Sequence, residues 1–215
     1  MAVAYVGSAA NGVTSTSNTV TYTPVAGNTI VAYLGITTSA SAFSSLADNN
    51  SNALSVGPTV TNGTRLIKSY YGTAITGATS YTISWTGSVA AWLNILEYSG
   101  VSSVNTSLTG NTNTGNSTAP TITCTTLVNN SWLAVGFTDT TSTTWTATTG
   151  NLRIKNTTAP SNCRSAGMDN TVVTAGSVTC TAGFGITPTV WAAVALELNP
   201  SATQLRELML LGVGI

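Results

Sequence analysis

The stretch "GATSYTISWTGSVAAWLNILEYSG" (residues 77–100) contains two patterns that decide the fold. Tyr81, Ile83 and Trp85 alternate with polar residues, which predicts a β-strand with one buried face. After Gly87 comes the apolar run "AAWLNILEY", which is bounded by turn residues and predicts a second, more buried strand. Neither pattern has the 3.6-residue period of a helix.

The rest of the chain carries the same signals. Short alternating or apolar runs recur between turns made of Gly, Asn, Ser and Thr, and they predict an all-β protein. The runs are "NTVTYT", "TIVAYLGI", "TRLIKSYY", "TITCTT", "SWLAVGF", "SVTCTAGF" and "VWAAVALEL". Only the C-terminal tail has a helical pattern.

The chain repeats itself at an offset near one hundred residues. The opening stretch aligns with "AGSVTCTAGFGITPTVWAAVALELNP" (175–200), and "NTVTYT…GNTIVAYLGI" aligns with "APTITCT…NNSWLAVGF". The equivalent positions on the alternating strand are Tyr81, Ile83 and Trp85 in the first half, and Cys180, Ala182 and Phe184 in the second. The alignment also pairs Tyr22 with Cys124 and Trp92 with Trp191, and equivalent positions should face the same way.

The predicted fold is a jelly-roll-like double-sheet β-sandwich, residues 1–200, built from two pseudo-repeated halves at about 15–100 and 118–200. A short, apolar, helical or extended docking tail follows at 201–215. The alternative is two tandem β-sandwiches that divide near residues 101–118.

The composition restricts the function. Charged residues make up 6% of the chain, and six Lys and Arg balance six Asp and Glu, so the formal net charge is zero. A soluble domain usually has about 25% charged residues. Without a basic face we expect no nucleic-acid partner and no binding to a membrane. A neutral, threonine-rich surface offers little repulsion against association, which suits a protein packed in an assembly.

The N-terminal stretch "MAVAYVGSAANG" has no basic region and only a short apolar run, so it does not resemble a secretory signal peptide. We therefore expect synthesis in a host cytoplasm, although the composition suits an extracellular particle. A virion protein combines these two properties, because lysis releases it.

The sequence contains little that suggests catalysis. It has no histidine, which removes the usual general base and the usual metal ligand. Glu97 and Glu197 occupy equivalent strand positions, but we expect each to face solvent at a strand end rather than to form a glycosidase pair. We predict that the protein is not an enzyme and that it has no cofactor and no metal.

Three weaker signals have structural explanations. The residues Asp48–Asn52, "DNNSN", offer oxygen ligands for calcium, but such residues also make hairpin turns without an ion. Tyr70 and Tyr71 form either a sugar-stacking platform or, as we expect, packing residues. Cys124 and Cys180 are expected to be reduced core residues, because three cysteines do not make a disulfide framework.

The tail is the sharpest functional signal. Ser201 and Gln204 form a capping box after Pro200, and Gly212 can end the helix. The predicted docking residues are apolar: Leu205, Leu208, Met209, Leu211, Val213 and Ile215. They dock either on the protein's own sandwich or, as we expect, on a neighbouring subunit.

The repeat, with "ILEYSGV" closing the first half and "VALELNP" the second, resembles a loose group of phage capsid-decoration, head-fibre and tail-fibre domains. The turn "ADNNSNAL" fits the same group, and the resemblance covers roughly residues 15 to 200. It implies a β-sandwich in a virion and carries no catalytic residues. We therefore expect a phage structural protein that binds other virion proteins and copies of itself. The alternative is a receptor- or carbohydrate-binding module for a host-surface glycan, and a polysaccharide-degrading enzyme is the least favoured reading.

Overall fold

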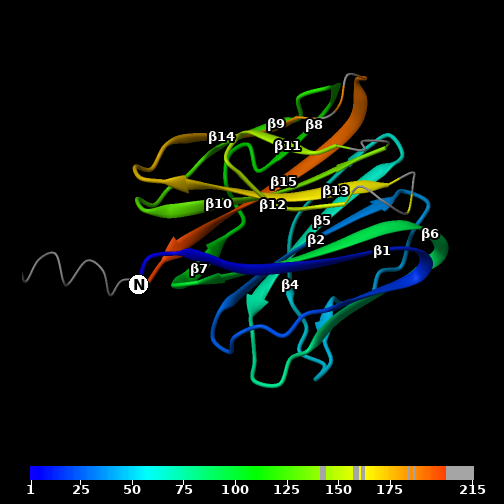
Figure 1. Ribbon diagram of the computed structural model, residues 1–215, viewed down its shortest axis with the longest axis horizontal. Coiled ribbons are helices and arrows are strands. Elements are labelled where there is room, and N and C mark those ends of the chain that lie inside the picture. The colour runs from blue at the N-terminus through cyan, green and yellow to red at the C-terminus, as the bar shows by residue number, and fades with distance from the viewer. Residues whose placement is uncertain (141–143, 157–159, 161–162, 184, 186, 202–215) are drawn as a thin grey trace, which may run out of the picture.

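The computed structural model describes residues 1–140, 144–156, 160, 163–183, 185 and 187–201. Every regular element in these residues is a β-strand, and the strands form antiparallel sheets packed on one another (Figure 1). The predicted all-β sandwich is confirmed. The predicted helical tail lies outside the described residues.

The first half forms one six-stranded sheet. Its strands are β1 (Ala4–Thr21), β2 (Thr29–Thr37), β3 (Ala47–Asp48), β4 (Ser55–Asn62), β5 (Arg65–Thr73) and β6 (Ser80–Ser99). Their order is β1-β6-β2-β5-β4, and β3 pairs with the start of β6. The register of β1 and β6 is interrupted beside Gly87, whose φ of 93° suits glycine. The start of β6 therefore folds over the sheet, and Tyr81 and Ile83 share a core with Leu34.

The second half divides the same arrangement between two sheets. Its strands are β7 (Val101–Asn105), β8 (Thr112–Ser117), β9 (Thr121–Thr125), β10 (Ser131–Asp139), β11 (Thr146–Thr149), β12 (Asn151–Lys155), β13 (Arg164–Val172), β14 (Ser177–Gly183) and β15 (Thr189–Pro200). The larger sheet has the order β12-β13-β10-β15-β7, with β8 also on β15, and the smaller sheet has the order β11-β14-β9. Ile122 and Cys180 of the smaller sheet share a core with Val135.

The two halves of the described chain have matching strand connectivity. In the first half β2 pairs with β6 on one side and with β5 on the other. In the second half β10 pairs with β15 on one side and with β13 on the other. Strand β1 corresponds to β7, β8 and β9 together, and β6 corresponds to β14 and β15. The equivalence therefore begins before residues 15 and 118, at β1 and β7.

The halves pack face to face through a third core. Val31, Tyr33 and Leu96 of the first half contact Ala134, Val194 and Leu196 of the second. Strand β2 lies on β10, β5 on β15, β6 on β13, and β1 on β12. The contact of β5 with β15 has its counterpart in that of β6 with β13, and the contact of β1 with β12 has its counterpart in that of β4 with β8. These pairs describe a pseudo-twofold axis that runs along β2 and β10.

Two glycines allow the close approach on this axis. A Cβ atom at Gly136 would lie 2.3 Å from the Tyr33 ring, and a Cβ atom at Gly35 would lie 2.7 Å from the Thr138 hydroxyl. The strand registers make Tyr33 equivalent to Gly136 and Gly35 equivalent to Thr138. At each point a small residue of one half faces a larger residue of the other, so the halves are matched to each other and not to copies of themselves.

One predicted equivalence is wrong. Trp92 and Trp191 are both buried, but Trp92 packs with Ala90 and Cys163, whereas Trp191 belongs to the core of the second half. Glu97 and Glu197 occupy matching register positions, opposite Ile30 and Leu133, so the offset is 100 on these strands. One extra residue before β15 shifts the alignment, and the two tryptophans point to opposite faces.

Candidate functional site

The six predicted docking residues, Leu205 to Ile215, lie outside the described residues. The described chain ends at Ser201, whose hydroxyl accepts a hydrogen bond of 2.9 Å from the N-terminal ammonium of Met1. The two ends of the described chain therefore meet (Figure 1).

Glu97 organises the loop that precedes β2. Its carboxylate accepts hydrogen bonds from the Tyr22 hydroxyl at 2.6 Å, from the Val25 backbone N–H at 2.9 Å and from the Asn28 side chain. Burial, together with this carboxylate, raises the pKa of Tyr22 well above its usual value. Glu97 is 1% exposed, so the expectation that it faces solvent is wrong.

Glu197 does the same for the loop that precedes β10. Its carboxylate accepts hydrogen bonds from the backbone N–H groups of Leu127 and Val128, both at 2.9 Å, and from the Ser131 hydroxyl. It is also fully buried, against expectation. A buried charge must be hydrogen-bonded, and both glutamates meet this need by holding equivalent loops. Each carboxylate thus holds a loop of its own half of the chain.

These loops present apolar side chains to solvent. Val25 is 60% exposed and Leu127 is 64% exposed, and each is the residue whose backbone N–H is held by a buried glutamate. Tyr33 faces Gly136 and Gly35 faces Thr138, so β2 and β10 run in the same direction and both loops lie at one end of the sandwich. Val173 is 76% exposed and Met1 is 74% exposed. Both lie at this end too, because Val173 lines one hollow together with Ala2, the neighbour of Met1, and with Trp132 near the start of β10. We call Met1, Val25, Leu127 and Val173 the apolar end.

A groove of about 460 Å³ lies at the end of the sandwich away from the apolar end, where β2 ends and β5 begins. The part of β6 that follows Gly87 also lines it. Its lining is mostly hydroxyl-bearing: Thr14, Thr37, Thr38, Ser39, Thr64 and Ser88, with Arg65, Val89 and Ala90. Arg65 is the cross-strand partner of Thr37 and is 5% exposed. Arg65 is therefore a largely buried, charged residue that lines a groove whose other residues are neutral.

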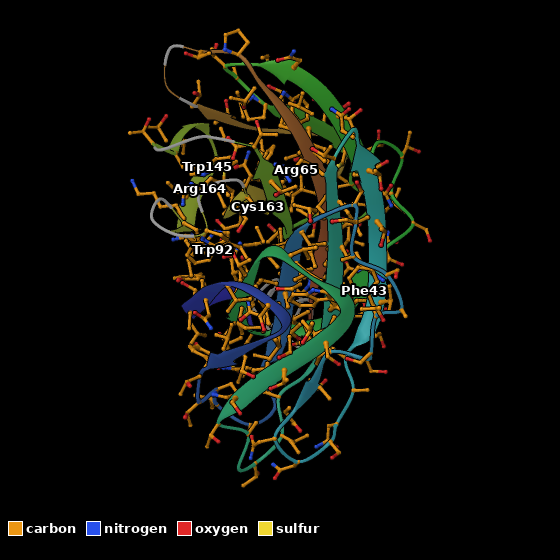
Figure 2. All side chains as sticks on the ribbon, turned by 90° about the vertical axis from the view of Figure 1, so that its right-hand side faces the viewer. Phe43, Arg65, Trp92, Trp145, Cys163 and Arg164 are labelled. Atoms are coloured by element: carbon orange, nitrogen blue, oxygen red, sulfur yellow. The ribbon has the colours of Figure 1, made fainter. Side chains whose placement is uncertain are left out.

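Figure 2 shows Arg65 labelled beside Cys163, with Arg164 and Trp92 nearby. The Arg65 guanidinium makes one hydrogen bond, from Nη1 to the Thr64 carbonyl at 3.2 Å, and its Nε has no partner in the described chain. Trp92, whose Nε1 also has no partner there, packs on Cys163. Burial raises the pKa of the Cys163 thiol to about 11, although the nearby Arg65 charge opposes this shift.

The remaining sequence candidates are structural. Asp48 accepts hydrogen bonds from the backbone N–H groups of Asn50 and Asn52, so the suggested calcium loop is closed on itself. Tyr70 is 1% exposed and belongs to the first core, so Tyr70 and Tyr71 do not form an exposed sugar platform. These contacts agree with the hairpin turn expected at Asp48–Asn52 and with the packing role expected of Tyr70.

All three cysteines are free and buried, which confirms the prediction for Cys124 and Cys180. Cys163 was not assigned to the core from the sequence. Burial raises the pKa of Cys124 and Cys180 to about 12. Their thiols are therefore protonated at neutral pH and behave as small apolar groups.

Comparison of the chain with protein-family models, with curated proteins and with solved structures found no match. Among the described residues, no group of three or more His, Cys, Asp or Glu side chains is placed to hold a metal ion. The same part of the chain contains no helix long and apolar enough to cross a membrane.

Proposed function

We propose that this protein is a structural subunit of a phage virion, of the capsid-decoration or fibre type, which acts by binding other proteins of the particle. The observation that carries the proposal is the apolar end. Exposed Val25 and Leu127 lie on loops that buried glutamates hold in place, and Ser201, the last described residue, lies at the same end of the sandwich. Rigid apolar side chains lose little conformational entropy on binding, so such loops suit a permanent contact.

The contacts of four carboxylates in the described chain are consistent with a structural role. Asp169 is paired with Arg153 at 2.7 Å, and Glu97, Glu197 and Asp48 accept hydrogen bonds from loops. The carboxylates that a hydrolase would need are occupied in holding the fold. An uncharged surface also favours close packing of subunits.

The tail is tested by a chain that ends at Pro200. All fifteen strands of the described residues remain, so circular dichroism should show an unchanged β-spectrum. Native mass spectrometry should show that the full chain associates and that the shortened chain is monomeric. A folded, shortened chain that still associates would exclude the tail from the contact.

The second candidate is a receptor- or carbohydrate-binding module. The groove beside Arg65 favours this alternative, because its hydroxyl-rich lining is chemically suited to a polar ligand. The two candidates use opposite ends of the sandwich and are therefore separable by mutation.

A further inference from the structure

We propose that the groove beside Arg65 binds an acidic sugar, with its carboxylate on the Arg65 guanidinium and its hydroxyl groups on the threonine and serine side chains of the groove. This inference deepens the carbohydrate-binding candidate and is independent of the assembly role. It rests on an unbalanced buried charge, on free hydroxyl groups and on the size of the groove.

The Arg65 guanidinium makes no ion pair within the described chain, although the buried Asp139 and Arg164 also lie near Cys163. A guanidinium has five N–H donors, and Arg65 uses one of them, on the Thr64 carbonyl. Arg153 differs from Arg65, because its guanidinium is paired with the Asp169 carboxylate and stacks on Tyr5. A buried charge without a partner is costly, and an oxyanion entering from the groove would supply the missing partner. A carboxylate matches the planar fork of the guanidinium.

The groove supplies hydroxyl groups beside this charge. Thr37 and Ser39 are hydrogen-bonded to each other at 3.1 Å. The side chains of Thr14, Thr38, Thr64 and Ser88 make no hydrogen bond within the described residues, and all four are exposed. Such groups donate and accept, as sugar hydroxyl groups do. The volume of about 460 Å³ is in the range of small-ligand sites.

The test is isothermal titration calorimetry of the full chain with glucuronate, with glucose and with inorganic phosphate. Glucuronate should bind at least about tenfold more tightly than either, because only glucuronate uses both the charge and the hydroxyl groups. Arg65→Gln should weaken glucuronate binding by about tenfold or more. Lys68→Gln is the matched control: it removes one positive charge from the opposite face of the same strand, and it should leave binding unchanged.

A second variant, Thr37→Val with Ser39→Ala, keeps Arg65 and removes two hydroxyl groups. It should weaken glucuronate binding without changing the weak binding of phosphate. Equal binding of glucuronate to wild type and Arg65→Gln, equal binding of phosphate and glucuronate, or no binding of glucuronate would each overturn the proposal. Val25→Asp with Leu127→Asp should bind glucuronate normally, so a failure of the assembly role is distinguishable from a failure of this site.

Discussion

Gly136→Ala tests whether the two halves are locked together at the pseudo-twofold axis. The added Cβ would lie 2.3 Å from Cδ1 and 2.4 Å from Cγ of Tyr33, whereas carbon atoms in contact prefer about 3.5 to 4.0 Å. The Tyr33 ring is fully buried and cannot turn into solvent. The ring or the facing sheets must therefore move by more than 1 Å, roughly, and overpacking of this kind costs about 1 to 3 kcal/mol. We expect the upper end of this range.

The assay is urea unfolding followed by tryptophan fluorescence. Gly185→Ala is a suitable control, because among the described residues its added Cβ would meet no atom closer than 3.6 Å. Tyr33→Ala should itself cost about 3 to 5 kcal/mol through the cavity it leaves. In a chain that carries Tyr33→Ala, Gly136→Ala should cost little, so the two effects should couple by about 2 kcal/mol. Additive effects, or a Gly136→Ala chain as stable as wild type, would refute the interlock.

Three further predictions concern buried polar groups. Glu97→Gln and Glu197→Gln should each lower the free energy of unfolding by about 1 to 3 kcal/mol, because hydrogen bonds to a charged acceptor become neutral ones, and urea titration measures the loss. Trp191→Phe should cost about 1 kcal/mol more than Trp92→Phe in the same assay, since the Trp191 Nε1 donates to Ser117 at 3.0 Å and the Trp92 Nε1 has no partner in the described chain. The three thiols should not react with a disulfide reagent in the native state at pH 8, and stability should fall as the pH rises from about 9 toward 11 to 12, because unfolded thiols ionise before the buried ones. Rapid labelling of the thiols in the native protein would contradict the thiol prediction. Equal losses of unfolding free energy in the two tryptophan variants would contradict the tryptophan prediction.

The strands with regular patterns were predictable, and those without were missed. β2, β6, β10 and β15 carry apolar runs that the sequence shows plainly. β4 contains Gly57 and Pro58, which are tolerated because the strand is at the edge of its sheet. β13 was missed because it is buried on both faces while containing Arg164, Ser165 and Asp169, so it shows neither alternation nor an apolar run.

The site residues illustrate a different limit. Glutamate at a strand end is usually exposed, and no local pattern distinguishes Glu97 from such a residue. Its burial follows from the return of the loop at Val25 and Asn28, which are about 70 residues away in sequence. Arg65 gave no signal, because its isolation depends on the packing of the second half against β5. The equivalence of Glu97 and Glu197, by contrast, was predictable from the repeat.

The most direct test of the assembly role uses density-gradient particles from a culture that produces the chain. Quantitative mass spectrometry should find the wild-type chain in the particle fraction in many copies. Val25→Asp with Leu127→Asp should remain folded but be lost from the particles. Thr61→Asp should be retained, since Thr61 is exposed but lies at the far end of the edge strand β4, opposite Leu66. Particles without the wild-type chain, or particles that retain the double variant, would contradict the account.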